Sequence, residues 1–244
     1  MKRRLFLASG MAALAGCSGL SNKLNESGFH HVLEQTQWLN EAVIGTRGRA
    51  RLYKPGDVNR DFRVNGFDTP GDPLYERYLR DGFASYRLVV DGEVEHKQAF
   101  SLAELRALHS LTQITRHDCV EGWSQIGEWR GVPLVDFLRV VRPTARARYV
   151  VFHCMDRAPD GTPYYESLNL HQAAHPQTLL ALDLNGRALD ADHGAPVRLR
   201  VPTQLGYKSA KWVNRIELAA SYGHVFGGKG GYWEDNGYEW YAGI

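Results

Sequence analysis

The spacing of apolar residues along the 244-residue chain predicts more strands than helices. Alternating or continuous apolar runs that are bounded by turn-forming residues indicate half-buried or buried strands. Apolar residues at helical spacing are fewer and predict only short helices. The pattern therefore predicts an α+β fold with a mixed β-sheet and short helices. Strands are expected at 86–90, 93–98, 112–117, 149–153, 179–184, 197–201 and 211–219.

Two residue pairs predict the turns that separate these strands. Asp91-Gly92 lies between the first two apolar runs, and Asn185-Gly186 follows the run 179–184. Asp-Gly and Asn-Gly favour tight hairpin turns because their backbones readily adopt positive φ angles. We therefore expect a hairpin at Asp91-Gly92 and a second turn at Asn185-Gly186.

Capping and proline signals predict where the short helices begin. Ser101 with Glu104 forms a capping-box pattern before an apolar run. Pro133 suits the first turn of a helix that continues to Val141. Apolar residues near one face predict a further helix over residues 29–43.

Three further stretches have a distinctive composition. Residues 45–82 are rich in Gly, Pro, Asp and Arg without clear periodicity, so loops with short strands are expected there. In 197–201, apolar residues alternate with Arg198 and Arg200, which predicts a strand with one apolar and one basic face. The tail from residue 227 is rich in Gly and aromatic residues and has no clear period.

The beginning of the chain has the layout of an export signal. Three basic residues at positions 2–4 precede an apolar run that ends at Gly16, and this run is too short to span a bilayer as a helix. The string RRLFL resembles the twin-arginine signal, which exports proteins that are already folded. The alternative is an ordinary secretory signal. We expect residues 1–16 to be this signal peptide.

The residues that follow resemble a lipoprotein junction. LAGC, which ends at Cys17, is similar to a bacterial lipobox, in which the cysteine after the cleavage site is lipidated. An unmodified cysteine in a cleaved leader is the alternative. Residues 17–28 are rich in Ser, Asn and Gly and are expected to be a tether. The catalytic domain is then expected over 29–244.

Composition and charge exclude some classes of protein. Hydrophobic content of 43% and charged content of 23% are typical of a folded globular chain. Removing residues 1–16, which carry three basic and no acidic side chains, changes the formal net charge from +2 to −1. A nearly neutral chain offers no electrostatic case for nucleic-acid binding, so no nucleic-acid partner is expected.

Two cysteines remain after Cys17 and leave three interpretations open. In an oxidising compartment, Cys119 and Cys154 could form a disulfide within a non-catalytic, β-rich binding module. Cys119 could instead ligate a metal, and Arg116 and His117 beside it would favour its thiolate form. A zinc site built from Cys119, His117 and His153 does not match common zinc spacings.

Three ordered motifs resemble the sulfite-oxidase superfamily of molybdopterin-dependent oxidoreductases. The motifs are RHDCVEGWSQIGEWRGVPLVDFL around Cys119, GAPVRLRVP at 194–202 and LGYKSAKWV at 205–213. The first has the Cys-Val-Glu-x-Trp-Ser run of the bacterial periplasmic protein-methionine-sulfoxide reductase branch, to which the chain is most similar. Three motifs in family order are more specific than any one. The resemblance implies a sulfite-oxidase-type molybdopterin-binding fold.

The resemblance also implies the roles of particular residues around a Mo-molybdopterin cofactor. Cys119 would be the metal ligand and a catalytic residue, and Glu121 would be a catalytic residue that relays protons, although an exposed carboxylate is equally compatible with the sequence. Arg198 would hold the cofactor phosphate, for which a planar and permanently charged guanidinium is suited. Ser209, Ala210 and Lys211 would meet the cofactor through backbone N–H groups and a cation.

Further cofactor contacts follow from looser matches and from two departures. Asn65, Asp68 and Thr69 resemble an early cofactor loop of the family. His193 stands where the reductases have asparagine, and histidine can still donate a hydrogen bond. Cys154 stands where they have a threonine near the pterin, and a thiol is a poorer donor.

The resemblance implies oxygen-atom transfer in the periplasm, with reduction of a neutral S-oxide or N-oxide such as methionine sulfoxide. Glu121 beside the ligand cysteine would disfavour an anion such as sulfite. A sulfite oxidase-like dehydrogenase is the alternative. A haem-containing membrane protein is the expected electron partner, a monomer the expected state, and lipidation of Cys17 would anchor the protein at the membrane.

Overall fold

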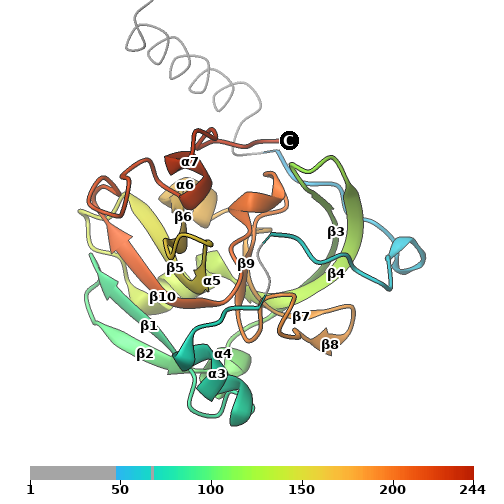
Figure 1. The fold of residues 1–244 in the computed structure, drawn as a ribbon, viewed down its shortest axis with the longest axis horizontal. Coiled ribbons are helices and arrows are strands. Elements are labelled where there is room, and N and C mark those ends of the chain that lie inside the picture. Colours follow the sequence, from blue (N-terminus) through green and yellow to red (C-terminus); the bar gives the residue numbers. More distant parts are fainter. Residues whose placement is uncertain (1–47, 67–68) are drawn as a thin grey trace, which may run out of the picture. The chain divides into compact units, whose positions relative to one another are not determined.

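The computed structural model describes residues 48–66 and 69–244 (Figure 1). The expected signal peptide 1–16, the tether 17–28, the helix 29–43 and Asp68 therefore lie outside the described residues. Within the described ranges, no helix has the length and apolar character needed to cross a membrane. Two five-stranded sheets and several short helices make up this part of the chain, which confirms the predicted α+β class.

The first sheet is mixed and has the strand order β2-β1-β10-β5-β6. β1 pairs in parallel with β10, and the other neighbours are antiparallel. A parallel neighbour requires a long connection, so segments more than a hundred residues apart meet in this sheet. Its strands are β1 (Arg87–Gly92), β2 (Gln98–Ser101), β5 (Tyr149–Arg157), β6 (Pro163–Asn169) and β10 (Val213–Ala219).

The second sheet has the order β3-β4-β7-β8, and β9 pairs with β7 beside this path. All its pairings are antiparallel. β9 lies near the centre of the view in Figure 1, and all three of its residues are buried. The strands are β3 (Leu111–Asp118), β4 (Ser124–Pro133), β7 (Leu179–Leu184), β8 (Arg187–Ala188) and β9 (Arg198–Arg200).

Short helices connect the strands, and two of the predicted helix signals are confirmed. Ser101 caps α4 through the Glu104 N–H, and the Glu104 carboxylate accepts from the Ser101 N–H. Pro133 is the N-cap of α5. The helices are η1 (Pro55–Asp57), α3 (Pro73–Arg80), α4 (Leu102–Ala107), α5 (Leu134–Val141), α6 (Leu170–Ala173), η2 (Gly206–Lys208) and α7 (Tyr232–Asp235).

The prediction of a tight turn at Asp91-Gly92 is wrong. β1 continues through Gly92, and Val90 pairs with Gln98, so residues 93–97 form the connection. The reason is tertiary: Asp91 and Gly92 pair with β10, and the Glu93 N–H donates to the Leu218 carbonyl. The second prediction holds, because Asn185 and Gly186 both have positive φ angles between β7 and β8.

The prediction of loops and short strands over 45–82 also needs correction. Residues 73–80 form α3, whose N-cap Asp72 accepts from the N–H groups of Leu74 and Tyr75. Asp at the N-cap with proline at the first helical position stabilises a helix start. Tyr75 and Tyr78 are buried, so one face of this short helix is stabilised by packing against the core.

The alternation in 197–201 predicted a basic strand face, and the structure shows that this face is buried. Arg198 and Arg200 are both 0% exposed. Their guanidinium groups lie over the ring of Trp129 from β4, at 5.1 and 5.3 Å from its centroid. β9 is therefore a strand with two buried charges.

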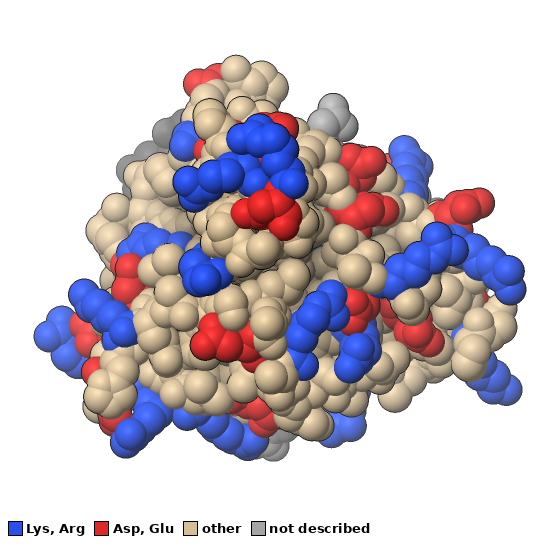
Figure 2. Space-filling view, turned by 90° about the horizontal axis from the view of Figure 1, so that it is seen from below, with Lys and Arg blue, Asp and Glu red and all other residues tan. Residues whose placement is uncertain are grey.

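Charged side chains of both signs are interspersed on the outside of the molecule. On the face in Figure 2, basic and acidic residues alternate over the surface. Such mixing keeps the local potential modest. Two further positive charges, Arg198 and Arg200 of β9, are buried, and each has guanidinium nitrogens without a hydrogen-bond partner.

Candidate active site

Cys119 lies in the loop of the β3–β4 hairpin. Asp118 pairs with Ser124, so residues 119–123 form the connection. The Cys119 N–H donates to the Trp123 carbonyl at 2.9 Å, and the Gly122 N–H donates to the Cys119 carbonyl at 3.0 Å. Gly122 has φ +88°, a conformation that glycine adopts without steric cost. The loop is thus held by its own backbone hydrogen bonds.

Cys119 opens into a pocket that gathers several of the predicted residues. Asn65, Glu121, Ser209, Ala210 and Lys211 line it together with Cys119. They come from the early loop, the β3–β4 hairpin and the segment between η2 and β10. Asn65 Oδ1 is buried without a hydrogen-bond partner, so an acceptor is available to a bound molecule.

The protein itself does not favour the thiolate form of Cys119. Burial raises the pKa of the thiol, and the charge of Glu121 adds to this, against the smaller opposing effect of Arg63. The expectation that Arg116 and His117 favour the thiolate is therefore wrong. Arg116 forms an ion pair with Asp118, and burial lowers the pKa of His117, so its ring is neutral. A bound metal cation would supply the missing stabilisation, because thiols that ligate metals are deprotonated.

Glu121 is exposed, and its carboxylate accepts a hydrogen bond from the Trp123 indole at 2.9 Å. The predicted catalytic carboxylate therefore lies at the pocket wall near solvent. Its negative charge is fixed beside Cys119 by the short hairpin loop.

Arg198 lies behind the pocket and connects two of the predicted cofactor segments. Its Nη1 donates to the His193 carbonyl at 3.0 Å, and its Nη2 donates to the Ser209 carbonyl at 3.2 Å. Nε has no partner, and among the described residues no carboxylate forms an ion pair with this guanidinium. Burial lowers the pKa of Arg198 to about 10, so it stays charged at neutral pH. A buried cation of this kind suits an anionic ligand.

Arg200, His117 and Trp129 extend the group of unpartnered donors. Arg200 donates to the Arg116 carbonyl at 2.6 Å and to Thr115, but its Nε and Nη1 have no partner. Both ring nitrogens of His117 and the indole nitrogen of Trp129 are also unpartnered. The alternating pattern of 197–201 placed Arg200 on the basic face of the predicted strand. Only the structure shows that this side chain is buried.

Lys211 and Thr69 meet at one loop. The Lys211 ammonium donates to the Asp192 carbonyl at 3.0 Å, and the Thr69 hydroxyl donates to the Asp192 carboxylate at 2.7 Å. Thr69 does not line the pocket. Its role in the described structure is to connect the early loop to the loop that precedes β9.

His193 and Cys154 are also outside the pocket lining. The His193 ring contacts the Asp190 carboxylate at 2.7 Å and the Phe62 carbonyl at 2.8 Å, so both its nitrogens are occupied by the protein. The backbone carbonyl of His193 is what reaches Arg198. Cys154 is a buried free thiol, and burial raises its pKa well above the usual value.

Asp156 is a pocket residue that the sequence interpretation missed. It lies two positions after Cys154 in β5, is buried, and its Oδ1 has no partner. Burial raises its pKa to about 7, against the smaller opposing effect of Lys211. An acidic residue inside a mostly buried strand was the available signal, because buried carboxylates are rare without a partner. Asp156 can accept hydrogen bonds from a bound cofactor.

Aromatic side chains complete the pocket wall. Tyr164, Tyr207 and Trp233 line it, and the Tyr164 hydroxyl donates to the Tyr207 carbonyl at 2.7 Å. Trp233 belongs to α7, in the aromatic tail. A larger cleft of about 760 Å³ lies elsewhere, next to Arg60, Asp190 and His193, and does not include Cys119.

The structure also bears on the two other interpretations of Cys119. Both Cys119 and Cys154 are free thiols, so the disulfide of a non-catalytic module is absent. In the described ranges, no group of three or more His, Cys, Asp or Glu side chains is arranged to hold a metal ion. The zinc site with His117 and His153, which the spacing already disfavoured, is therefore not formed among the described residues.

Comparison with known proteins now shows the family. Residues 77–224 match the oxidoreductase molybdopterin-binding domain. The chain therefore belongs to this family of the sulfite-oxidase superfamily and is a molybdenum-dependent oxidoreductase. Its cofactor is Mo-molybdopterin, as predicted.

Two relatives carry more detailed names. A candidate protein-methionine-sulfoxide reductase subunit of Azospira oryzae, named YedZ1, is 38% identical over 99% of this chain and 87% of its own length. The protein-methionine-sulfoxide reductase catalytic subunit MsrP of Xanthomonas campestris is 41% identical over 73% of this chain. That match spans 58% of the Xanthomonas protein.

A solved structure shows the same fold. The sulfane dehydrogenase SoxCD of Paracoccus pantotrophus aligns with a TM-score of 0.51 and 24% identity. The alignment covers 57% of this chain and 39% of the SoxCD chain. It supports the predicted sulfite-oxidase-type fold.

The pocket has the features that this cofactor requires. A thiol at a hairpin loop offers a soft ligand for the metal. Arg198 is a buried cation without a carboxylate partner, and Asn65 and Asp156 offer unpartnered oxygens to the hydrogen-bond donors of a pterin. Cys119, Ser209–Lys211 and Arg198 are the residues that would hold the group.

Proposed function

We propose that this enzyme reduces a neutral S-oxide, such as methionine sulfoxide. The observation that carries the proposal is the pocket itself, in which Cys119 faces aromatic side chains and two carboxyl groups. Aromatic walls suit the uncharged substituents of a sulfoxide, whereas Glu121 and Asp156 disfavour an anion such as sulfite. The names of the two relatives support the same substrate class.

Different residues of the chain have different roles around the cofactor. Cys119 ligates the metal, and Arg198 with the Ser209–Lys211 segment orients the molybdopterin. When bound, Mo-molybdopterin supplies the two-electron change and the oxygen-atom exchange. Overall, a sulfoxide, two protons and two electrons give a thioether and water. Asp156, with a pKa of about 7, is able to hold a proton inside the pocket.

Steady-state assays with methionine sulfoxide and with sulfite test this function. We expect turnover of methionine sulfoxide with a chemical electron donor and little oxidation of sulfite. Cys119→Ser should abolish turnover and leave the fold intact, with Cys154→Ser as the matched control for loss of a thiol. Preferential oxidation of sulfite would favour the alternative, a sulfite oxidase-like dehydrogenase.

The electron donor and the location are a second part of the proposal. We infer a membrane haem protein as donor, since the relatives are named as a subunit and as a catalytic subunit. Twin-arginine export to the periplasm and lipidation of Cys17 would keep the enzyme near such a donor. Fractionation of cells that express the wild type or Cys17→Ser tests this: the variant should move from the membrane to the soluble periplasmic fraction. A wild type that is already soluble would contradict the anchor.

A further inference from the structure

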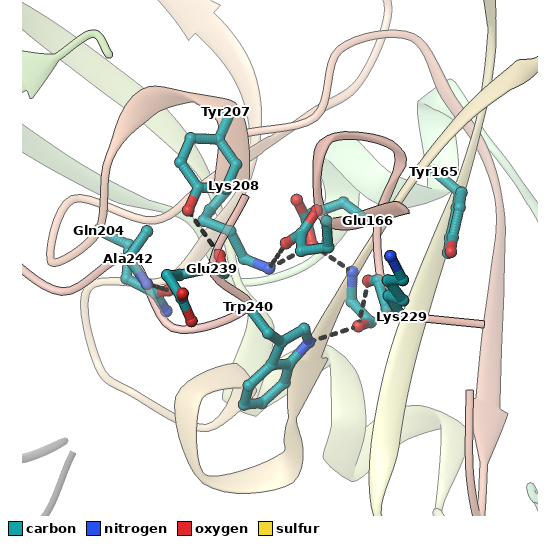
Figure 3. A network of polar contacts seen from close by, with 12 residues as sticks. Tyr165, Glu166, Gln204, Tyr207, Lys208, Lys229, Glu239, Trp240 and Ala242 are labelled. Atoms are coloured by element: carbon teal, nitrogen blue, oxygen red, sulfur yellow. Dashed lines mark hydrogen bonds and ion pairs between the residues drawn. The ribbon is translucent and has the colours of Figure 1, made fainter. Parts of the chain in front are cut away.

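A fully buried ion network lies next to the pocket, outside the residues assigned to the cofactor (Figure 3). The Lys208 ammonium donates to a carboxylate oxygen of Glu166 and, at 2.6 Å, to one of Glu234. The three side chains are at most 1% exposed. The ammonium also lies 5.3 Å from the centroid of the Trp240 ring. We call Lys208, Glu166 and Glu234 the buried triad.

The buried triad joins three segments that are far apart in the sequence. Glu166 belongs to β6, Lys208 to η2 and Glu234 to α7. Burial, and then the charge of Glu234, raise the pKa of Glu166 well above its usual value. The Lys208 ammonium, which bonds to both carboxyl groups, offsets the negative charge of this pair. Such a balanced arrangement is costly to break from one side.

Both ends of the buried triad are next to pocket residues in the chain. Ser209, Ala210 and Lys211 follow Lys208 directly and line the pocket, and so does Trp233, the neighbour of Glu234. One buried ammonium therefore links the cofactor segment to the aromatic wall.

The helix that carries Trp233 depends on these contacts. α7 is a single turn, and its N-cap Gly231 provides no side-chain cap. One helical turn is not stable by itself in water. A Cβ at Gly231 would collide with the carboxylates of Glu234 and Glu166, so the backbone is packed directly against the buried triad.

Trp233 packs against the hydrophobic core and contacts two aromatic residues of the tail. It stacks on Tyr238 with ring centroids 5.0 Å apart and meets Tyr232 edge-on at 5.2 Å. Tyr232 in turn stacks on Tyr164 of the pocket wall at 5.6 Å. We propose that the buried triad is a positioning device that sets Trp233 in the pocket wall and thereby determines which S-oxides the enzyme accepts.

This inference rests on the proposed function for its substrate class. A sulfoxide with large substituents, such as methionine sulfoxide, would reach the indole of Trp233. Dimethyl sulfoxide, with two methyl groups, would fill only the space next to the metal. Displacing Trp233 should therefore weaken binding of the larger substrate and spare the smaller one.

The test compares Glu234→Gln with Glu239→Gln in the holoenzyme. Glu234→Gln keeps the shape but removes the charge, and Glu239 is an exposed carboxylate of the same tail. We expect Glu234→Gln to raise KM for methionine sulfoxide about tenfold with kcat nearly unchanged, as expected for lost uniform binding. KM for dimethyl sulfoxide should stay within twofold, and Glu239→Gln should change neither. Trp233→Leu should behave like Glu234→Gln, and the double variant should be no worse than Trp233→Leu.

Hydrogen exchange provides a readout that needs no turnover. Peptides that span 227–244 should exchange faster in Glu234→Gln than in the wild type or in Glu239→Gln. Three results would overturn the inference. They are additive effects of Glu234→Gln and Trp233→Leu on KM, equal effects of Glu234→Gln on the KM of both substrates, and unchanged hydrogen exchange in Glu234→Gln. If Glu234→Gln does not fold, the charge-free combination of Lys208→Met, Glu166→Gln and Glu234→Gln takes its place in the same measurements. A wild type that reduces no S-oxide would instead reject the proposed function, while the exchange experiment would still decide whether the buried triad holds α7.

Discussion

Arg198 and Lys208 are buried cations only ten residues apart, and their surroundings are opposite. Lys208 is bonded to two carboxylates, whereas in the part of the chain that the structure describes Arg198 is bonded only to carbonyl oxygens. Taking a charge out of water costs several kcal/mol unless an opposite charge compensates. The Lys208 charge is thus compensated by carboxylates of the protein itself, whereas the Arg198 charge is not, and we expect an anionic ligand to compensate it.

The difference explains how one short segment can serve two purposes. The internally paired cation fixes the backbone that leads into Ser209–Lys211. The unpaired cation behind that backbone keeps its charge available to the cofactor. Stability and binding are therefore assigned to different residues, and each can be changed separately.

Removing Lys208 from its ion pairs with Glu166 and Glu234 should have the largest effect on stability. Lys208→Met leaves two carboxyl groups buried without their cation, and we expect the free energy of unfolding to fall by about 3–5 kcal/mol. Chemical denaturation measures this, with the exposed Lys97→Met as control. Adding Glu166→Gln and Glu234→Gln should restore most of the loss, since no unpaired charge then remains. A triple variant as unstable as Lys208→Met would show that charge pairing is not what stabilises this region.

Removing the unpaired cation should affect cofactor retention more than stability. For Arg198→Met we expect molybdenum and pterin content to fall roughly 10–100-fold, the range seen when supporting contacts of a metal site are lost. The unfolding free energy of the cofactor-free protein should not fall, because an uncompensated charge is removed. Elemental analysis and pterin fluorescence measure the content, with the exposed Arg139→Met as control. Full molybdenum content in Arg198→Met would contradict the phosphate-binding role.

Asp156 is a buried group that, like Arg198, lacks a partner, and its effect should depend on pH. Its pKa is raised from 3.8 to about 7, so between pH 4 and 7 the folded protein keeps a proton that the unfolded chain has released. Stability of the cofactor-free protein therefore falls as pH rises through this range. Asp156→Asn removes this penalty, which for a pKa raised from 3.8 to about 7 is about 4 kcal/mol at pH 8, and little change is expected at pH 4.

Thermal unfolding across pH tests this expectation, with the exposed Asp61→Asn as control. Cys154 and Tyr164 also interact with Asp156, and burial raises the pKa of each well above its usual value, so neither group titrates between pH 4 and 7 in the folded protein. A pH slope that persists in Asp156→Asn would assign the dependence to another group.

The smallest expected effect is binding of a simple anion by the unpaired cluster. Inorganic phosphate should stabilise the cofactor-free protein by about 1.4 kcal/mol at ten times its Kd. Arg198→Met should abolish this gain, and Lys97→Met should retain it. Equal stabilisation of the wild type and Arg198→Met would show that phosphate acts elsewhere on the protein.

The predicted elements that survived are those with local signals. The capping box at Ser101 and the Asn185-Gly186 turn depend on neighbouring residues, so a sequence pattern suffices for them. Asp91-Gly92 failed because β10, more than a hundred residues later, pairs with it. Among site residues, Cys119 and Ser209–Lys211 share a pocket as the motifs implied. Asp156, Glu166 and Glu234 lie in no motif and were not predicted, and Lys208 lies in the third motif but was given no role.

The sequence by itself determined the family and the cofactor, because three ordered motifs carry that information without any geometry, and the same motifs predict Cys119 as the metal ligand. Only the tertiary structure decided which charges are paired. Arg198, Arg200 and Lys208 are all basic residues in one stretch of chain, and a pattern cannot say which of them meets a carboxylate. That depends on where β6 and α7 place Glu166 and Glu234, and electrostatic energy depends on distance and burial rather than on sequence separation.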